Sequence, residues 1–293
     1  MAINSSFPSR EEYLKLKRKR KIVRYSLIAF LLILLFGVLS FISYRPGLRI
    51  SKVELNGGIL VTQSDVEKES LSFMSGTYYF VVPRNNAFVF PKEPLKQHLL
   101  NSFKRIETIN IEREDFTSIK IDITERKPVA IWCDSLPNQS SAKVSTSTIS
   151  SNSSSSHCYF MDRDGTIFAE APYFSGDAYF KYYGNISTTT PISQSYIAST
   201  TQFYEVSNFI AYAKSLDIHP QYLVAEQDGQ FSLVLSGGGE IYFDLKEPLS
   251  KTAKNLEALL KTQAISSIRA YDLPIQYIDL RFGNKLFYKL KGE

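Results

Sequence analysis

The hydrophobic pattern of the chain begins with an uncharged apolar run, Ser26–Ser43, that has Tyr25 and Tyr44 at its ends. Its 18 residues would span roughly 27 Å as a helix at about 1.5 Å each, close to the ~30 Å hydrocarbon core of a bilayer. The run is apolar on every face, whereas a helix on the surface of a soluble domain is apolar on one face. It is longer than the apolar region of a usual signal peptide, and no small-residue cleavage motif ends it. The pattern therefore predicts a transmembrane helix over residues 25–44.

After this run, the alternation of polar and apolar positions predicts a small sheet with two helices. The predicted elements are a strand around Val53 and Leu55, a helix that begins with the capping box Ser64-Asp65-Val66-Glu67, an extended segment Tyr78–Val82, a helix that opens at Pro94, and two strands around Ile109 and Ile121. This β-α-α-β-β order favours one sheet whose apolar face is covered by both helices.

From Pro128 onward, short alternating runs predict a second region made mainly of strands. The predicted strands are Val129–Trp132, Tyr159–Met161, Thr166–Ala169, Tyr222–Ala225, Phe231–Leu235, Ile241–Leu245, Tyr277–Phe282 and Lys285–Leu290. Two stretches with helical spacing, Phe203–Leu216 and Leu249–Ile265, predict helices. The sequence therefore predicts an α+β fold. It has a tail over residues 1–24, a transmembrane helix over 25–44, a small domain over 45–127, and a larger, mostly antiparallel β domain over 128–293 with helices on one face.

Basic residues are concentrated before the apolar run. Residues 1–24 hold eight basic and two acidic residues, so a net charge of +6 lies in this tail and about −1 in the rest of a chain whose total is +5. Because basic segments stay on the cytoplasmic side of a membrane, we expect the tail in the cytoplasm and residues 45–293 outside it. A folded region without a basic excess is unsuited to nucleic acid, which is not an expected partner.

The two cysteines, Cys133 and Cys158, bracket a segment rich in Ser, Thr and Asn, residues 134–157. Such a composition buries too little apolar surface to offset the entropy of ordering, so we expect a disordered insertion. If the two ends of this loop lie on paired strands, the cysteines meet and can form a disulfide in an oxidising compartment. The alternative is a pair of half-buried free thiols.

One motif has the letters of a catalytic site. The segment Asp162-Arg163-Asp164-Gly165-Thr166 matches the aspartyl-nucleophile motif of haloacid-dehalogenase-type phosphatases. Its two aspartates also match the metal motif of type II membrane glycosyltransferases. The first class needs a downstream acidic pair and the second a parallel nucleotide-binding unit, and the sequence pattern contains neither. A hairpin turn with glycine at a position of positive φ explains the same residues.

Other catalytic patterns are missing from the sequence. His98, His157 and His219 have no partner at metal-ligand spacing, and there is neither a glycine-rich phosphate loop nor a serine in a nucleophile elbow. We therefore expect a protein that acts by binding, with no enzyme activity, metal, cofactor or small-molecule substrate.

Four segments resemble, in the same order, the bacterial cell-division family FtsQ/DivIB. They are VELNG at 53–57, IKIDITERKPVAIW at 119–132, YFMDRDGTIFAEA at 159–171 and YIDLRFGNKLFYK at 277–289. The resemblance implies a polypeptide-transport-associated (POTRA) domain before Pro128 and an FtsQ-type β domain after it. It also implies a non-enzymatic scaffold at the division septum of the bacterial plasma membrane. The implied partners are FtsB/DivIC-like and FtsL-like membrane proteins, together with the septal peptidoglycan synthase FtsW and its transpeptidase partner.

In this family the last strands of the β domain receive FtsB by strand addition, which the resemblance assigns here to Arg281, Phe282 and the strand end near Leu290. A strand at a sheet edge leaves unpaired backbone groups that can pair with another chain. Phe282, Phe287 and Tyr288 would then be apolar anchors, and Arg281 a partner for an acidic side chain. Since successive residues face opposite sides of a sheet, half of the apolar side chains here are expected to complete the core. Two other functions are left open: a component of export or envelope assembly that uses the same domain, and a type II membrane-anchored glycosyltransferase.

Overall fold

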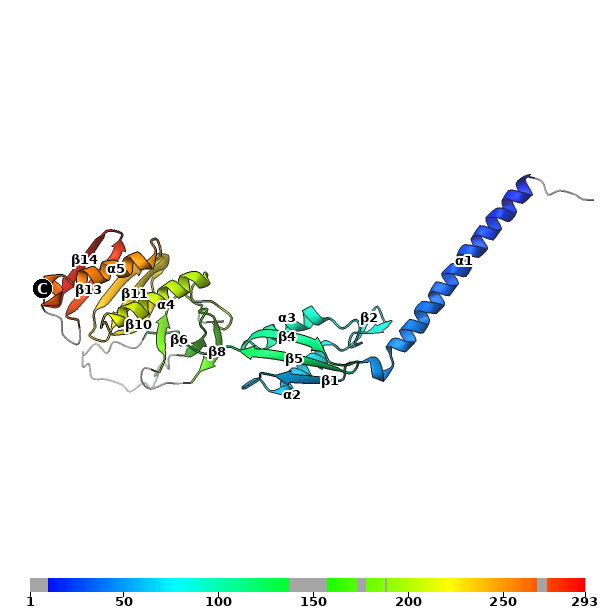
Figure 1. The fold of residues 1–293 in the computed structure, drawn as a ribbon, viewed down its shortest axis with the longest axis horizontal. Coiled ribbons are helices and arrows are strands. Elements are labelled where there is room, and N and C mark those ends of the chain that lie inside the picture. The colour runs from blue at the N-terminus through cyan, green and yellow to red at the C-terminus, as the bar shows by residue number, and fades with distance from the viewer. Residues whose placement is uncertain (1–9, 137–156, 173–177, 188, 268–272, 293) are drawn as a thin grey trace, which may run out of the picture. The chain divides into compact units, whose positions relative to one another are not determined.

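The structure is a computed structural model that describes residues 10–136, 157–172, 178–187, 189–267 and 273–292 (Figure 1). Most of the predicted Ser-rich insertion lies outside the described residues. The chain divides into two compact units, residues 1–125 and 126–293, each with its own hydrophobic core. The fold is mixed α+β, with an N-terminal apolar helix and a large, mostly antiparallel sheet, which confirms the predicted fold class at this level.

Helix α1, Arg10–Ser43, contains the predicted transmembrane run. The stretch Tyr13–Ser43 is long and apolar enough to cross a membrane, and none of its most apolar window is buried against the rest of the chain. The helix starts well before the predicted limit, because Lys, Arg and Leu are good helix formers and continue it into the basic tail. Apolar side chains exposed on all sides of a helix suit the interior of a bilayer.

In the part of the first unit that the structure describes, the sheet has three strands in the order β1-β5-β4, with β5 parallel to β1 and antiparallel to β4. The elements after α1 are a 3-10 turn (Pro46–Leu48), β1 (Lys52–Asn56), α2 (Gln63–Phe73), β2 (Thr77–Tyr78), β3 (Val82–Pro83), α3 (Lys92–Ser102), β4 (Ile106–Arg113) and β5 (Ser118–Glu125). Alternate strand residues and one side of each helix share a single core. Strands β2 and β3 form a separate antiparallel hairpin.

Helix α2 begins two residues earlier than the capping box predicts, and Thr62 rather than Ser64 is its N-cap. The hydroxyl of Thr62 accepts a hydrogen bond from the backbone N–H of Asp65 at 3.3 Å. Val61 and Val66 flank this cap at the positions of a hydrophobic staple, and both are buried in the core. Thr and Ser have similar preferences for the N-cap position, so local sequence does not choose between Thr62 and Ser64. The packing of Val61 and Val66 in the core favours Thr62.

The second unit is built on a sheet of nine strands within the described residues, in the order β14-β13-β12-β11-β10-β9-β6-β7-β8. Its elements are β6 (Ala130–Cys133), β7 (Cys158–Met161), β8 (Ile167–Ala171), β9 (Phe180–Tyr183), α4 (Thr200–Ser215), β10 (Pro220–Ala225), a 3-10 turn (Gln227–Gly229), β11 (Gln230–Leu235), β12 (Glu240–Asp244), α5 (Leu249–Leu260), α6 (Gln263–Ser266), β13 (Ile275–Phe282) and β14 (Lys285–Leu290). Strand β9 was not predicted. It lies between β6 and β10 and is parallel to both, so its pairing comes from segments distant in sequence.

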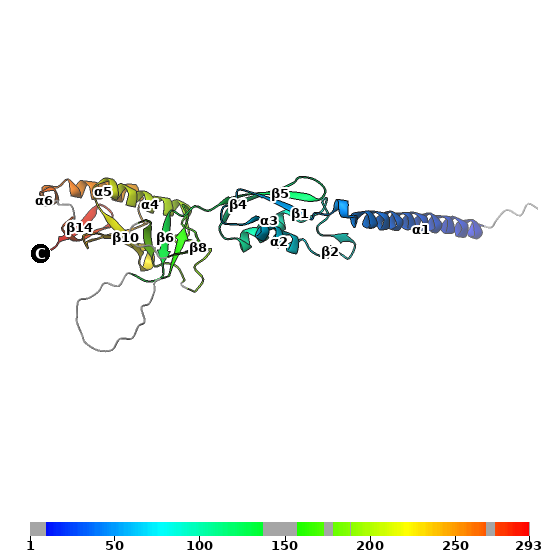
Figure 2. The same cartoon turned by 90° about the horizontal axis from the view of Figure 1, so that it is seen from below.

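Helices α4 and α5 cover one face of the nine-stranded sheet, and the main core of the unit lies between them and the strands (Figure 2). The spacing that predicted α4 buries Phe203, Val206 and Phe209 in this core. A smaller apolar cluster lies on the opposite face, because strand residues alternate between the two sides. Its buried members are Ile131, Cys133, Ala171, Tyr183 and Tyr222.

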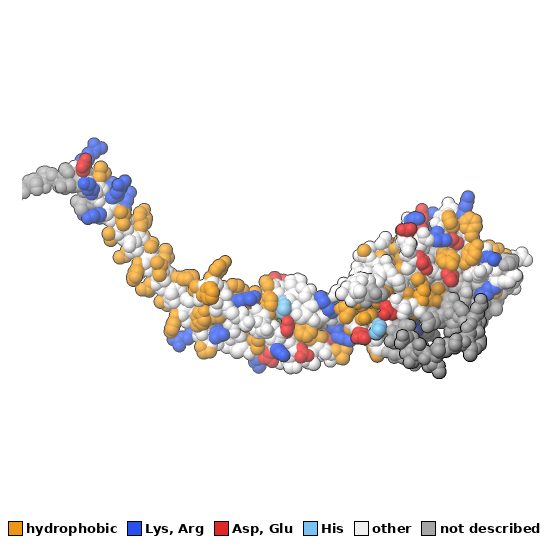
Figure 3. Space-filling model, turned by 180° about the vertical axis from the view of Figure 1, so that it is seen from behind, with side chains coloured by type: hydrophobic (Ala, Val, Ile, Leu, Met, Phe, Trp, Pro, Cys, Tyr) orange, Lys and Arg blue, Asp and Glu red, His pale blue; other side chains and the backbone are white. Residues whose placement is uncertain are grey.

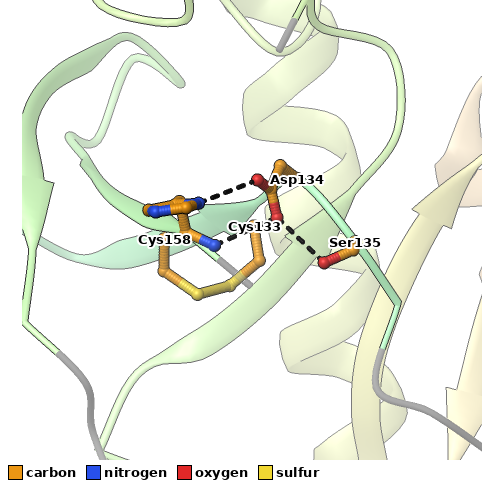
Figure 4. Close-up of a disulfide and its surroundings, with 5 residues drawn as sticks. Cys133, Asp134, Ser135 and Cys158 are labelled. Atoms are coloured by element: carbon orange, nitrogen blue, oxygen red, sulfur yellow. Dashed lines mark hydrogen bonds and ion pairs between the residues drawn. A yellow bond between two sulfur atoms is a disulfide. The ribbon is translucent and has the colours of Figure 1, made fainter. Parts of the chain in front are cut away.

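Cys133 and Cys158 form a disulfide between β6 and β7 (Figure 4). They lie directly opposite each other in the antiparallel register, with their Cα atoms 4.1 Å apart. Next to the bond, the carboxylate of Asp134 accepts hydrogen bonds from the backbone N–H of His157 at 3.0 Å and from the hydroxyl of Ser135 at 2.9 Å. The strand pairing that the disulfide requires is therefore present. The disulfide and the hydrogen bond between Asp134 and His157 join the two ends of the Ser-rich insertion.

Candidate partner-binding edge

Strand β14 forms one edge of the nine-stranded sheet, and β13 is its only paired neighbour within the described residues. The register places Phe282 opposite Lys285 across a two-residue turn, and Asp279 opposite Phe287 farther along. In an antiparallel pair, half of the backbone groups of an edge strand point away from the sheet. β14 therefore presents a row of backbone donors and acceptors along residues 285–290.

The opposite edge of the sheet, β8, is partly covered by its own chain. The N–H of Ile167 donates to the carbonyl of Gln194 at 2.9 Å, and the N–H of Ser193 donates to the carbonyl of Ile167 at 2.8 Å. A bridge between Thr166 and Ser195 extends this contact. Of the two edges, β14 is therefore the better suited to strand addition.

The three aromatic side chains predicted as anchors are exposed on β14 or beside it. Phe282 is 56% exposed, Phe287 50% and Tyr288 38%. The rings of Phe282 and Phe287 meet edge to face, with their centroids 5.3 Å apart. Exposed aromatic rings of this kind supply much of the binding energy at protein interfaces once a partner covers them. The edge therefore combines backbone pairing groups with a small aromatic patch, defined here as Phe282 and Phe287, while Tyr288 lies on the other face of β14.

The side chain of Leu290 packs within the protein, and its contact with a partner stays a prediction. It is half-buried and packs, with Leu286, against the main core of the unit. Because residues alternate along a strand, Phe287 lies on the opposite face of the sheet from Leu286 and Leu290. The backbone of Leu290 still ends the edge strand, so it can take part in pairing while its side chain stabilises the fold.

Arg281 is engaged within the protein. Its Nε donates to Oδ1 of Asp279 at 2.8 Å, its Nη2 donates to Oδ2 at 2.5 Å, and its Nη1 donates to the side-chain oxygen of Gln230. The guanidinium also lies 5.2 Å from the centroid of the Tyr242 ring. A guanidinium with all three nitrogens occupied is poorly placed to pair with an acidic residue of a partner, so Arg281 orders the surface beside the aromatic patch.

The electrostatics of this cluster follow from burial and from the ion pair. Burial alone would raise the pKa of Asp279, but its hydrogen bonds with Arg281 and the guanidinium charge together hold that pKa below its usual value. The hydrogen bond to Asp279 raises the pKa of Arg281. Burial, with a hydrogen bond to Glu240, raises the pKa of Tyr242 to about 12. Asp279 and Arg281 thus stay charged, and Tyr242 neutral, across the physiological range.

The segment 162–166, which matches a catalytic motif in sequence, forms a hairpin turn between β7 and β8. Oδ1 of Asp162 accepts hydrogen bonds from the backbone N–H groups of Asp164 and Thr166, each at 2.9 Å, and Oδ2 pairs with Arg126. The carboxylate of Asp164 accepts a hydrogen bond from the hydroxyl of Tyr204 at 2.7 Å. Both carboxylates therefore serve the turn and its junction with α4. Within the described residues there is no group of three or more side chains placed to hold a metal ion.

Two features of the surface escaped the sequence interpretation. The pairing of Asp279 with Arg281 has a sequence signal, because residues two apart on a strand lie on the same face. The β2–β3 hairpin next to α1 has no such sequence signal, since its tip residues, Tyr79 and Phe80, are not the residue types that usually form a tight turn.

In comparisons with known proteins, no family model matches the chain, and no curated protein matches it.

Proposed function

We propose that this protein is a single-pass membrane scaffold of the bacterial division machinery, of the FtsQ/DivIB type, that binds an FtsB/DivIC-like partner by strand addition at β14. The observation that carries the proposal is an open sheet edge with an exposed aromatic patch, in a chain that also has a helix able to span a membrane. Pairing of backbone groups supplies affinity, and pockets for alternate side chains select the partner.

The first unit supports the same assignment. Its order of elements, a parallel pair β1–β5 flanked by β4 with α2 and α3 on one face, is compatible with a POTRA domain. The proposed topology places the basic tail in the cytoplasm and both units outside it, where FtsB/DivIC-like and FtsL-like partners expose their folded segments. Contacts with FtsW and its transpeptidase partner would follow from this placement at the septum.

A membrane anchor makes a modest interface sufficient. Partners held in the same membrane meet at a raised effective concentration, so a single added strand can bind stably without a large contact area. The aromatic patch adds contacts at the end of β14 where the turn with β13 lies. We therefore expect binding to depend on Phe282 and Phe287 more than on the charged side chains around them.

The binding test uses the full chain in lipid nanodiscs and a peptide from the exported part of an FtsB/DivIC-like partner. We expect Phe282→Asp and Phe287→Asp each to weaken binding at least tenfold, because a carboxylate in the aromatic patch opposes its burial. Val129→Asp is the matched control: Val129 is 51% exposed in the same unit but precedes β6, far along the sheet from β14. Unchanged affinity in a folded Phe282→Asp protein would refute the site.

The mode of binding has its own measurement. Strand addition protects backbone amides, so hydrogen exchange over residues 285–290 should slow when the peptide binds, while exchange in β8 stays the same. Protection confined to side-chain contacts elsewhere would argue against strand addition. In cells, a fluorescent fusion of the full chain should form a band at midcell, and an even distribution around the envelope would contradict the septal role.

A further inference from the structure

The β2–β3 hairpin projects two aromatic side chains into solvent. The central residues of its turn, which form the tip, are Tyr79 and Phe80, and they are 92% and 95% exposed. The turn is closed by a hydrogen bond from the N–H of Val81 to the carbonyl of Tyr78 at 2.9 Å. Rings this exposed gain almost nothing from packing within the described part of the chain, so their contribution to folding is small.

The backbone of this tip is strained. Tyr79 has φ 49° and Phe80 has φ 61°, in the left-handed region that side chains other than Gly, Asn and Asp disfavour. A tight hairpin with positive φ at both central residues normally uses Asn-Gly. Two large aromatic residues at such positions, with their rings in solvent, oppose local stability. Backbone strain of this kind is often found at functional sites.

The hairpin is attached to the end of the apolar helix. The hydroxyl of Ser40 in α1 donates to the carbonyl of Val81 at 2.7 Å, and the hydroxyl of Tyr44 donates to the carbonyl of Phe80 at 3.4 Å. The side-chain amide of Asn86, just beyond the hairpin, donates to the hydroxyl of Ser43 at 2.9 Å. These contacts keep the tip beside the last turn of α1, at the level where the apolar run ends (Figure 1).

Further apolar and basic side chains lie at the same end of the first unit. Phe88, 62% exposed, and Phe116, 48% exposed, are in ring contact, and the guanidinium of Arg113 lies over both rings at 5.4 Å and 5.6 Å. The guanidinium of Arg45 lies 5.0 Å from the ring of Phe41. Figure 3 shows hydrophobic side chains along α1 and around its C-terminal end. Aromatic rings interleaved with arginines are typical of the interfacial region of a membrane.

We infer that Tyr79 and Phe80 bind a lipid bilayer, inserting their rings into the interfacial region on the side where α1 ends. The lipid surface is favoured as the occupant because the tip is continuous with the apolar run and lies at the depth where interfacial aromatics belong. A single helix attaches the first unit to the membrane at one point. A second attachment at the hairpin holds this unit against the membrane surface. The inference rests on the membrane anchor of the proposed function, but not on the partner-binding edge.

The test uses the full chain in nanodiscs and lipids that carry bromine atoms, which quench nearby tryptophan fluorescence. In Phe80→Trp, emission should shift to shorter wavelength and be quenched most by bromines near the headgroup. The signal of Trp132, the only native tryptophan, is subtracted with the parent chain. Ile59→Trp is the matched control, because Ile59 is 86% exposed in the same unit but follows β1 at its opposite end, away from α1. It should be unquenched.

Phe36→Trp, within the apolar run of α1, separates failure of the anchor from failure of the inference. It should be quenched most by bromines near the ends of the acyl chains. If Phe36→Trp is quenched and Phe80→Trp behaves like Ile59→Trp, the hairpin does not bind lipid and the inference is wrong, while the anchor stands. A shift to shorter wavelength in Phe80→Trp without quenching means that protein covers the tip, which also overturns the inference. No quenching of Phe36→Trp refutes the anchor and the inference together.

Discussion

The guanidinium of Arg281 binds the carboxylate of Asp279 through two parallel hydrogen bonds on the open face of β13, beside the exposed ring of Phe287. Asp279 is almost fully buried, whereas Arg281 is half-buried. These hydrogen bonds hold the Arg281 side chain in one position, so the pair helps to define the shape of the proposed binding surface.

Loss of Arg281 should destabilise the second unit. Arg281→Met leaves the carboxylate of Asp279 buried without its partner, and we expect a loss of about 2 kcal/mol in the free energy of unfolding. Denaturant unfolding of the full chain, with exchange of β13 amides as a local readout, measures the change. Lys246→Met is the control, because the Lys246 side chain is 77% exposed in its pair with Asp244 and should contribute little.

The same pair makes stability depend on pH in a defined direction. The pKa of Asp279 is lower in the folded than in the unfolded chain, where its usual value is 3.8. The stabilisation is therefore complete above that value and is lost as pH falls through the lower, folded pKa. The parent chain should lose its stability advantage over Asp279→Asn only below about pH 4. A difference that shrinks between pH 6 and pH 8 would contradict the assignment, as judged from unfolding midpoints across the pH range.

We expect substitutions that relieve the strain at Tyr79 and Phe80 to stabilise the hairpin and to weaken its attachment to the membrane. Tyr79→Asn combined with Phe80→Gly supplies the preferred residues for this turn and should stabilise the hairpin by about 2 kcal/mol. The same change removes both rings, so the first unit should become more mobile against the membrane. Amide exchange of residues 77–83 measures the first effect, and spin-label mobility on α3 in nanodiscs measures the second. Faster exchange in the double variant would show that the turn is unstrained.

Gly165 in the β7–β8 turn should be intolerant of a side chain. Its φ is +79°, and an added Cβ would lie 2.7 Å from a ring carbon of Phe203 in α4. We expect Gly165→Ala to cost about 3 kcal/mol, from backbone strain together with displacement of a buried ring. Gly229→Ala isolates the strain, because Gly229 has φ +69° and no atom within 4 Å of its added Cβ. Thermal unfolding of both variants should show a clearly larger loss for Gly165→Ala.

Removal of the disulfide should destabilise the second unit without changing its fold. Cys133 and Cys158 are 25 residues apart, and closing a loop of this length restricts the unfolded chain by about 3 kcal/mol. The double change Cys133→Ala and Cys158→Ala should lower the free energy of unfolding by that order, while binding at β14 is retained because that strand is at the other end of the sheet. Equal stability of the reduced and oxidised parent chains would contradict this.

The local sequence pattern is enough to predict many of the helices, strands and turns of this protein. The apolar run predicts a membrane-spanning helix from length and uniformity alone, and alternation predicts most strands because each one has a core face and a polar face. The turn at Asp162 was predicted from its glycine, and the disulfide required only that its two strands pair. These features depend on residues close together in the chain or on a simple repeat.

Tertiary structure decided what depends on contacts between distant segments. β9 is a strand because β6 and β10 flank it, and its own four residues are too few to predict a strand by alternation. Thr62 caps α2 because Val61 and Val66 pack in the core, and the side chain of Leu290 serves the core while Phe287 stays exposed. Arg281 is occupied by Asp279 and Gln230, and the tip at Tyr79 and Phe80 is strained and attached to α1. Sequence states which side chains can make such contacts, but only packing in three dimensions selects the ones that form, since each requires burial or pairing with a residue elsewhere in the chain.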